Sequence, residues 1–158
     1  MPFFEKQNSK DCSVHSLNNA MGRVIITPEE VSAEIDKRVA AYASILSLPL
    51  DSKVVSIYKK QLVDNDTFFS AESVWYAAAA LGRCTLPKRL AYPGSLTPEI
   101  VHKDHLIFLG KGKEGEPHAV GVRNGEIYDS LNKSNTPIPL TEENISAIYK
   151  QVLGVYAI

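Results

Sequence analysis

The first third of the chain carries apolar residues at helical spacing. This spacing predicts a helix over residues 9–21 and a second helix that begins after Thr27. Thr27 can cap the second helix, Pro28 suits its first position, and Glu30 can complete a capping box. The apolar positions that carry this helix to about residue 46 are Val31, Ile35, Val39 and Tyr42.

Two more helices are predicted in the central part of the chain. Pro49 ends the second helix, and a third is predicted over residues 51–62, with Asp51 or Ser52 at its start. Because the connection is short, the second and third helices are expected to pair as a hairpin. Ser70 can cap a fourth helix, which ends at Gly82 in the usual C-terminal glycine position.

After Gly82 the pattern changes to that of β-strands. Asn124-Gly125 stands between two apolar segments and is the strongest short-range signal for a hairpin with a two-residue turn. Helices first and hairpin-connected strands afterwards predict an α+β fold with an antiparallel sheet. Strands are predicted over residues 84–90, 105–109, 119–123, 126–130 and 154–158, with a helix over residues 142–151 before the last one.

Composition narrows the class of protein. The 158 residues suit a single domain, and 44% hydrophobic with 22% charged residues is typical of a globular chain. Seventeen basic against eighteen acidic residues argue against a nucleic-acid partner, which normally requires a basic excess. The N-terminal residues lack the apolar run of a signal peptide, and no apolar stretch is long enough to predict a membrane span. We therefore expect an intracellular protein, cytoplasmic or nuclear, that is a monomer with free thiols.

The two cysteines stand in different surroundings. Cys12 is predicted to lie in the first turn of a helix, where free N–H groups and the helix dipole favour a thiolate and can bind an oxyanion. Gln7, five residues upstream, could supply a second oxyanion donor from its side-chain amide. Cys84 stands in an apolar strand context and is interpreted as structural. By position alone, the commoner alternative is that Cys12 is a small buried hydrophobe, as most lone cysteines are.

A thiolate nucleophile requires an acid and base, usually histidine. His15 lies on the same predicted helix as Cys12, a geometry that leaves little room for a substrate carbonyl. His102 and His105 stand in a charged stretch and lack both the spacing and the third ligand of a metal site. His118 lies on the predicted hairpin, which fixes its neighbours. We therefore expect His118 to be the catalytic histidine, and we expect neither a metal nor a cofactor.

The hairpin register selects a partner for His118. If the two-residue turn forms, residue 120 faces 129 and residue 118 faces 131, so that these positions share one face. Asp129 is then the diagonal neighbour of His118, at roughly 7–8 Å between backbones, a span that the two side chains can close. Asn132 would lie on the other face of a regular ladder. The alternative is a chance pair of one His and one Asp at a strand end.

Several of these residues belong to one N-terminal motif. Glu5-Lys6-Gln7 is followed at fixed spacing by Cys12, His15, Leu17, Asn18 and Asn19. This order resembles the E-K-Q-x4-C-x-x-H-x-L-N-N signature of the Josephin family of papain-like deubiquitinating cysteine proteases. The resemblance continues in chain order through Thr27-Pro28-Glu29-Glu30, Phe68-Phe69-Ser70 and Leu81-Gly82 to His118 and Asp129-Ser130-Leu131.

The resemblance implies a papain-like α+β fold in which residues 1–158 form a single catalytic domain, with a helical arm at about residues 28–63. The activity it implies is that of a thiol-dependent deubiquitinase, which hydrolyses the bond after the C-terminal glycine of ubiquitin or a ubiquitin-like protein. Ubiquitin or a ubiquitin-like protein and its conjugates are therefore the expected partners. The resemblance implies Cys12 as nucleophile, His118 as general base and acid, Asp129 as orienting residue, Gln7 as oxyanion donor, and His15, Asn18 and Asn19 in packing and hydrogen bonding around the nucleophile helix.

Two features depart from the family pattern. Ala119 follows His118, where the family usually has a bulky aromatic residue, and the loop before His118 is long and glycine-rich. The function therefore stays open between a deubiquitinase and two alternatives. One is a papain-like peptidase that processes a dedicated non-ubiquitin protein, and the other is a catalytically weak module that binds ubiquitin. The arm and residues 110–117 are expected to border the substrate channel. Leu46, Leu48 and Leu50 would either contact a partner or be buried within the hairpin.

Overall fold

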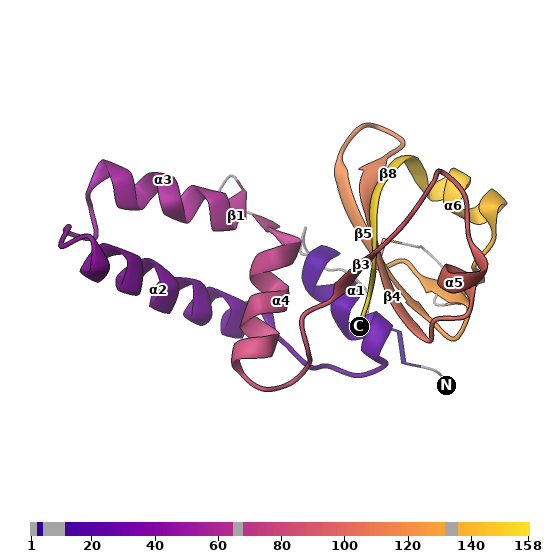
Figure 1. The fold of residues 1–158 in the computed structure, drawn as a ribbon, viewed down its shortest axis with the longest axis horizontal. Helices are drawn as coiled ribbons and strands as arrows, with labels where there is room; N and C mark the ends of the chain where they lie inside the picture. Colours follow the sequence, from indigo (N-terminus) through magenta and orange to yellow (C-terminus); the bar gives the residue numbers. More distant parts are fainter. Residues whose placement is uncertain (1–2, 5–11, 65–67, 132–135) are drawn as a thin grey trace.

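The computed structural model of the chain describes residues 3–4, 12–64, 68–131 and 136–158. These residues combine six helices with antiparallel strands, so the predicted α+β class is confirmed. Figure 1 shows a helical hairpin that projects from one side of a sheet, with the remaining helices packed around the sheet itself. None of the described helices is both long and apolar enough to cross a membrane.

The helices of the first half begin at the predicted caps. Thr27 caps α2 (Pro28–Ile45), Ser52 caps α3 (Lys53–Leu62), and Ser70 caps α4 (Ala71–Ala80). The carboxylate of Glu30 accepts a hydrogen bond from the Thr27 hydroxyl at 3.2 Å and from its backbone N–H, which completes the predicted capping box. Helices α2 and α3 form the projecting hairpin, hereafter called the arm (Figure 1).

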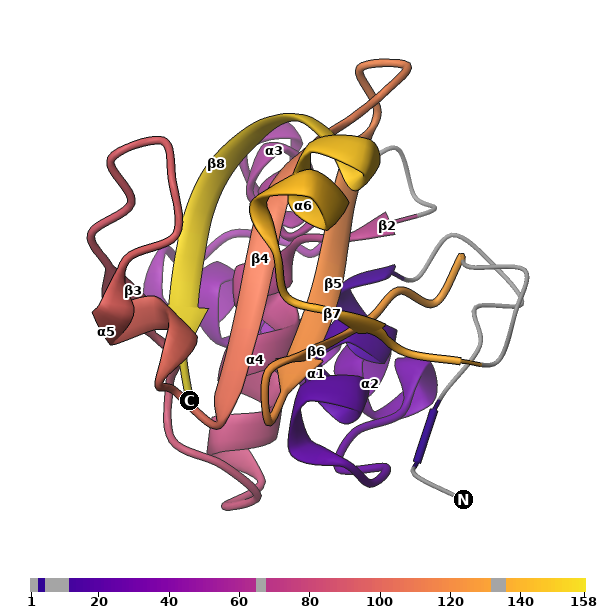
Figure 2. The same ribbon diagram turned by 90° about the vertical axis from the view of Figure 1, so that its right-hand side faces the viewer.

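Six strands form one antiparallel sheet in the spatial order β3-β8-β4-β5-β6-β7. Their bounds are β3 (Lys88–Leu90), β4 (His105–Gly112), β5 (Pro117–Arg123), β6 (Glu126–Tyr128), β7 (Ile138–Pro139) and β8 (Tyr149–Ala157). A separate pair, β1 (Val63–Asp64) and β2 (Phe68–Phe69), connects the arm to α4. Figure 2 shows α5 (Pro98–Val101) and α6 (Glu142–Ile148) in front of the sheet, and α1 (Cys12–Met21) and α4 behind it.

Element ends in the second half differ from the predictions. The helix predicted over residues 142–151 ends at Ile148, and β8 begins at Tyr149, because the ring and hydroxyl of Tyr149 are buried against β4. The strand predicted over residues 84–90 is reduced to Lys88–Leu90, whereas β4 extends past its predicted end to Gly112. Helix α5 was missed, although Thr97-Pro98 repeats the helix-start pattern of Thr27-Pro28.

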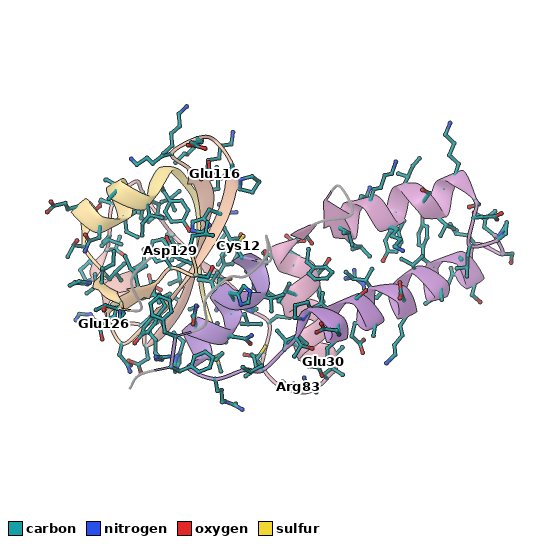
Figure 3. The ribbon with its side chains drawn as sticks, turned by 180° about the vertical axis from the view of Figure 1, so that it is seen from behind. Cys12, Glu30, Arg83, Glu116, Glu126 and Asp129 are labelled. Carbon is teal, nitrogen blue, oxygen red and sulfur yellow. The ribbon has the colours of Figure 1, made fainter. Side chains whose placement is uncertain are left out.

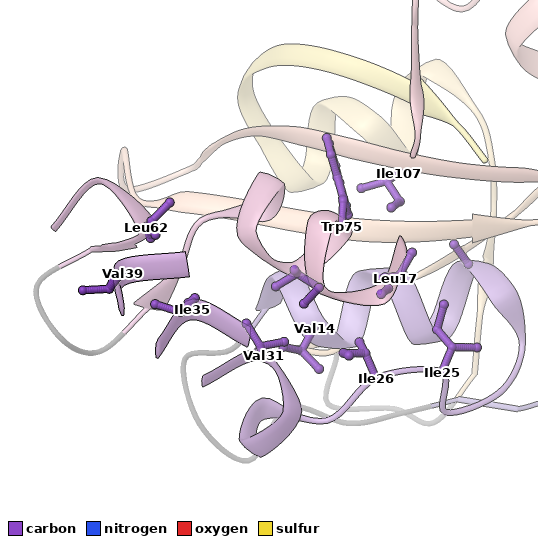
Figure 4. Close-up of a cluster of buried hydrophobic side chains, with 14 of the residues drawn as sticks. Val14, Leu17, Ile25, Ile26, Val31, Ile35, Val39, Leu62, Trp75 and Ile107 are labelled. Carbon is purple, nitrogen blue, oxygen red and sulfur yellow. The ribbon is translucent and has the colours of Figure 1, made fainter. Parts of the chain in front are cut away.

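Apolar side chains form a core on each face of the sheet. Successive residues of β4 alternate between them, since Ile107 belongs to one core and Phe108 to the other. Burial on both faces holds the strand in register, because a slip of one residue would exchange the two sets of side chains. The first core, drawn in Figure 4, includes Val14, Leu17, Val31, Ile35 and Trp75; the second includes Ile100, Leu106, Val120, Ile127 and Tyr149.

Helix α1 is held closely against the sheet. It packs mainly on β5, where Gly121 has no side chain to keep the helix away. A Cβ at Gly121 would lie 2.6 Å from the backbone nitrogen of Ala20. The buried side chain of Asn18 donates to the carbonyl of Ile26 at 3.0 Å and accepts from the N–H of Ile25 at 2.9 Å. These contacts fix where the first residue of the helix, Cys12, lies relative to β5.

Candidate active site

The hairpin of β5 and β6 has the predicted register. Asn124 and Gly125 have positive φ values of 52° and 77°, as a type I′ turn requires at both central positions. The ladder ends at Gly121 and Tyr128, so that β5 continues to Pro117 beyond the end of β6. The paired residues are Arg123 with Glu126, Val122 with Ile127, and Gly121 with Tyr128, which confirms the predicted register.

This register brings His118 and Asp129 together. Nε2 of His118 lies 2.9 Å from Oδ1 of Asp129, and the two side chains are only 5% and 15% exposed. The same carboxylate oxygen accepts a hydrogen bond from the Leu131 N–H at 3.0 Å, which holds the carboxylate in place. A carboxylate bound to one ring nitrogen fixes the orientation of the imidazole and leaves the other nitrogen for a second partner.

Cys12 is the second partner of His118. It is the first residue of α1 and lines the same cleft as His118. Because Nε2 is hydrogen-bonded to Asp129, Nδ1 is the ring nitrogen that remains for the hydrogen bond with Cys12. Figure 3 shows Cys12 at the end of α1 between the arm and the sheet, with Asp129 on the sheet side. The structure thus brings together three of the predicted site residues.

Opposing effects set the pKa of His118. Burial of the ring lowers the pKa, since burial penalises the charged imidazolium. Hydrogen bonds with Asp129 and Cys12, and the negative charges of both groups, act in the opposite direction and raise the pKa from 6.5 to about 9. With both partners in place, His118 therefore carries a proton at neutral pH and can act as an acid.

The cleft around these residues has a volume of about 360 Å³ and mainly apolar walls. Its lining residues include Leu109 and Gly110 of β4, Phe69 of β2, and Ala71 at the start of α4. Ala119 is buried and lines the cleft, where it adds only a methyl group next to His118. Apolar walls reduce access of water to the reacting atoms and strengthen charge interactions there.

Gln7, the predicted oxyanion donor, lies outside the described residues, as does Asn132, which was predicted to lie on the other face of the ladder. Cys84 lies apart from the cleft and packs against the first core, where partial burial raises the pKa of its thiol. This position agrees with the structural role predicted for Cys84.

The histidines other than His118 have different surroundings. His15 is half-buried on α1, and His102 is exposed at the end of α5. Nδ1 of His105 donates to the carbonyl of Ala20 at 2.8 Å and so ties the start of β4 to α1. Among the described residues, no group of three or more His, Cys, Asp or Glu side chains is placed to hold a metal ion.

The leucines predicted as partner contacts divide into two kinds. Leu46 and Leu50, at the tip of the arm, are 43% and 64% exposed. Leu48 lies between them and packs against the first core. Burial within the hairpin therefore applies to Leu48, and Leu46 and Leu50 remain accessible to a partner.

Sequence reasoning missed one residue beside the site. The Tyr149 hydroxyl donates to the carbonyl of Phe108 at 3.0 Å and lies 3.3 Å from the carbonyl of His118. Its ring centroid is 6.0 Å from that of the His118 imidazole. A helix was expected to include Tyr149, and no local pattern distinguishes a tyrosine that begins a strand from one that ends a helix.

The chain matches no protein-family model, and no curated protein matches its sequence.

Proposed function

We propose that the protein is a thiol-dependent deubiquitinase of the Josephin type, with a papain-like arrangement of Cys12, His118 and Asp129. The observation that carries the proposal is the buried 2.9 Å hydrogen bond between His118 and Asp129, next to a thiol at the start of a helix. An imidazole oriented by a carboxylate and paired with a thiol is the arrangement that nucleophilic catalysis by cysteine requires.

In the proposed reaction, the Cys12 thiolate attacks the carbonyl carbon of the C-terminal glycine of ubiquitin. The N–H groups at the start of α1, and Gln7 as the resemblance implies, bind the oxyanion. When the carbon–nitrogen bond breaks, protonated His118 gives its proton to the departing lysine amine, and a thioester remains on Cys12. Water then attacks the thioester, His118 accepts a proton from that water, and the thiolate of Cys12 leaves.

The raised pKa of His118 supports its role as proton donor. A general acid must hold its proton at the working pH, and the Asp129 and Cys12 neighbours keep that proton on the imidazole up to about pH 9. The mainly apolar cleft supports acyl transfer, because it limits hydrolysis to water that enters after the amine has left.

Incubation with ubiquitin that carries a thiol-reactive warhead at its C-terminus tests the proposal. We expect a covalent adduct that is retained in Cys84→Ala and lost in Cys12→Ala. Cys84→Ala is the matched control because it removes the other thiol of the chain, which lies apart from the cleft.

Two other results would overturn the proposal. If no adduct forms while iodoacetamide labels Cys12 much faster than a free model thiol, the protein is a peptidase for a different substrate. If Cys12 labels no faster than a model thiol, the enzyme proposal fails.

A further inference from the structure

We propose that Tyr149 is a positioning residue for His118, because its hydroxyl fixes the part of β5 that carries the imidazole. The role assigned to Tyr149 rests on the function proposed above, in which His118 serves Cys12.

The backbone around His118 pairs with a neighbouring strand on one side only. β6 ends opposite Gly121, so β5 has no ladder with β6 at His118. On its other side His118 faces Gly110, where the ladder between β4 and β8 changes register. At His118 the strand therefore has a regular ladder on one side only, with β4, and contacts from outside the sheet can hold its other side.

Tyr149 supplies such a contact. The side chain is buried, and its hydroxyl lies within hydrogen-bond distance of two strand carbonyls, Phe108 on β4 and His118 on β5. One hydroxyl thus links the two strands at the position of the histidine. Gly110 makes room for the ring, since a Cβ there would lie 2.8 Å from Cδ1 of Tyr149.

The groups around the imidazole keep this hydroxyl in its donor form. Burial raises the pKa of Tyr149 well above its usual value, and the negative charges of Asp129 and Cys12 raise it further. The titratable groups that face His118 are Cys12 from α1, Asp129 after β6, and Tyr149 at the start of β8. The raised pKa keeps Tyr149 neutral through the pH range in which the imidazole titrates.

Loss of the hydroxyl would act on His118 rather than on the substrate. The pKa of about 9 depends on hydrogen bonds to Asp129 and Cys12 that form only when the imidazole is held between them. A β5 backbone that is free to shift lengthens both bonds, so the pKa of His118 falls toward 6.5. A role in stability alone would lower the melting temperature and leave this titration unchanged.

The test compares Tyr149→Phe with Tyr92→Phe. Tyr92 is the matched control, because its ring packs 6.4 Å from Phe108 on the same face of the sheet and does not line the cleft. NMR measures the pKa of the His118 imidazole, and iodoacetamide labelling across pH 5–10 measures the reactivity of the Cys12 thiol next to it. Both measurements use the full chain and need no ubiquitin.

For Tyr149→Phe we expect the His118 pKa to fall by about 1 or more and the labelling profile to change with it. On a ubiquitin substrate, kcat should fall about tenfold with KM within about twofold, the pattern of a lost transition-state contribution. Tyr92→Phe should leave all of these quantities at their wild-type values.

An unchanged His118 titration in Tyr149→Phe would overturn the proposal, whatever happens to the melting temperature. So would equal effects of Tyr149→Phe and Tyr92→Phe. Because titration and labelling do not involve ubiquitin, a wild-type protein that forms no ubiquitin adduct refutes the proposed substrate without deciding the role of Tyr149.

Discussion

The imidazole of His118 has two partners, Asp129 at Nε2 and Cys12 at the remaining nitrogen. Each partner favours the protonated ring, and together they outweigh the burial that opposes it. In the proposed mechanism the enzyme is active while this proton is present. Because the pKa is raised, the activity that depends on the imidazolium is fully present near pH 6.5 and is lost as the pH rises through about 9.

Asp129→Asn should shift the loss of activity at alkaline pH to a lower pH. The substitution removes the negative charge and the carboxylate acceptor that hold the proton on His118, so the pKa of His118 falls toward 6.5. We expect kcat/KM at pH 8 to fall by about 10²-fold, the usual contribution of a positioned acid and base. The measurement is kcat/KM of a ubiquitin substrate as a function of pH.

Asn132→Ala serves as the control for this substitution, since it changes the neighbouring candidate for an orienting residue. We expect turnover to change far less than in Asp129→Asn, and far less than in Asp129→Ala. A larger effect from Asn132→Ala would show that the hydrogen bond between His118 and Asp129 does not serve catalysis.

At the scale of elements, the site depends on the contact between α1 and β5. The thiol belongs to the helix and the imidazole to the strand, and Gly121 allows the two backbones to meet. The distance between Cys12 and His118 is therefore a property of this packing rather than of either element alone.

Gly121→Ala should separate the two elements. The new Cβ would overlap the backbone of α1 at Ser16 and Ala20, which cannot move as a flexible side chain can. We expect a loss of about 1–3 kcal/mol in the free energy of unfolding, typical of overpacking, together with slow labelling of Cys12 by iodoacetamide. Urea unfolding and labelling at 25 °C measure the two effects.

Gly94→Ala is the control, because nothing lies within 4 Å of its Cβ position. Its φ of 95° makes any side chain strained, so some loss of stability is expected there as well, with labelling of Cys12 unchanged. Equal labelling rates in the two variants would contradict the role of Gly121 in placing the thiol.

At the scale of the whole molecule, the arm projects away from the sheet and leaves its tip accessible (Figure 1). Leu46 and Leu50 are exposed there, and Ile45 beside them is 81% exposed. Leu48 instead packs against the first core and joins the tip to the body of the arm. This division separates residues that stabilise the arm from residues that are free to meet a protein substrate.

The double variant Leu46→Ser, Leu50→Ser should change binding of a protein substrate without affecting the chemistry. We expect KM for a ubiquitin conjugate to rise by roughly 3- to 10-fold from lost apolar contact. The free energy of unfolding should change by less than about 1 kcal/mol, because both side chains are exposed. Steady-state kinetics and urea unfolding measure these quantities.

Leu48→Ala is the matched control at the same tip, and it should lower stability because it removes a packed side chain. A KM that stays at the wild-type value in the double variant would exclude the arm tip from substrate binding.

Local signals in the chain were sufficient where an element depends on its own residues. Thr27, Ser52 and Ser70 cap helices that begin where predicted, since a cap acts within a few residues. Asn124 and Gly125 set the hairpin register, and that register places Asp129 beside His118. These features follow from short-range chemistry that the sequence displays directly.

The elements that were missed depend on distant partners. The predicted helix ends early at Ile148 because Tyr149 finds its hydrogen-bond acceptors on β4 and β5, about 30 to 40 residues earlier in the chain. β4 continues to Gly112 because β5 and β8 pair with it on both sides. Local spacing alone does not reveal such partners.

The sequence by itself determined the α+β class, the starts of α2, α3 and α4, the hairpin register, and the choice of His118 and Asp129 as a pair. Only the tertiary structure decided that Cys12 lies in the same cleft, that the His118 pKa rises to about 9, and that Tyr149 links the two strands beside the imidazole. The physical reason is the separation along the chain over which each interaction acts. Caps and tight turns act between neighbours in the chain, whereas burial and the pairing of charges arise only when α1, β5 and β8 pack together.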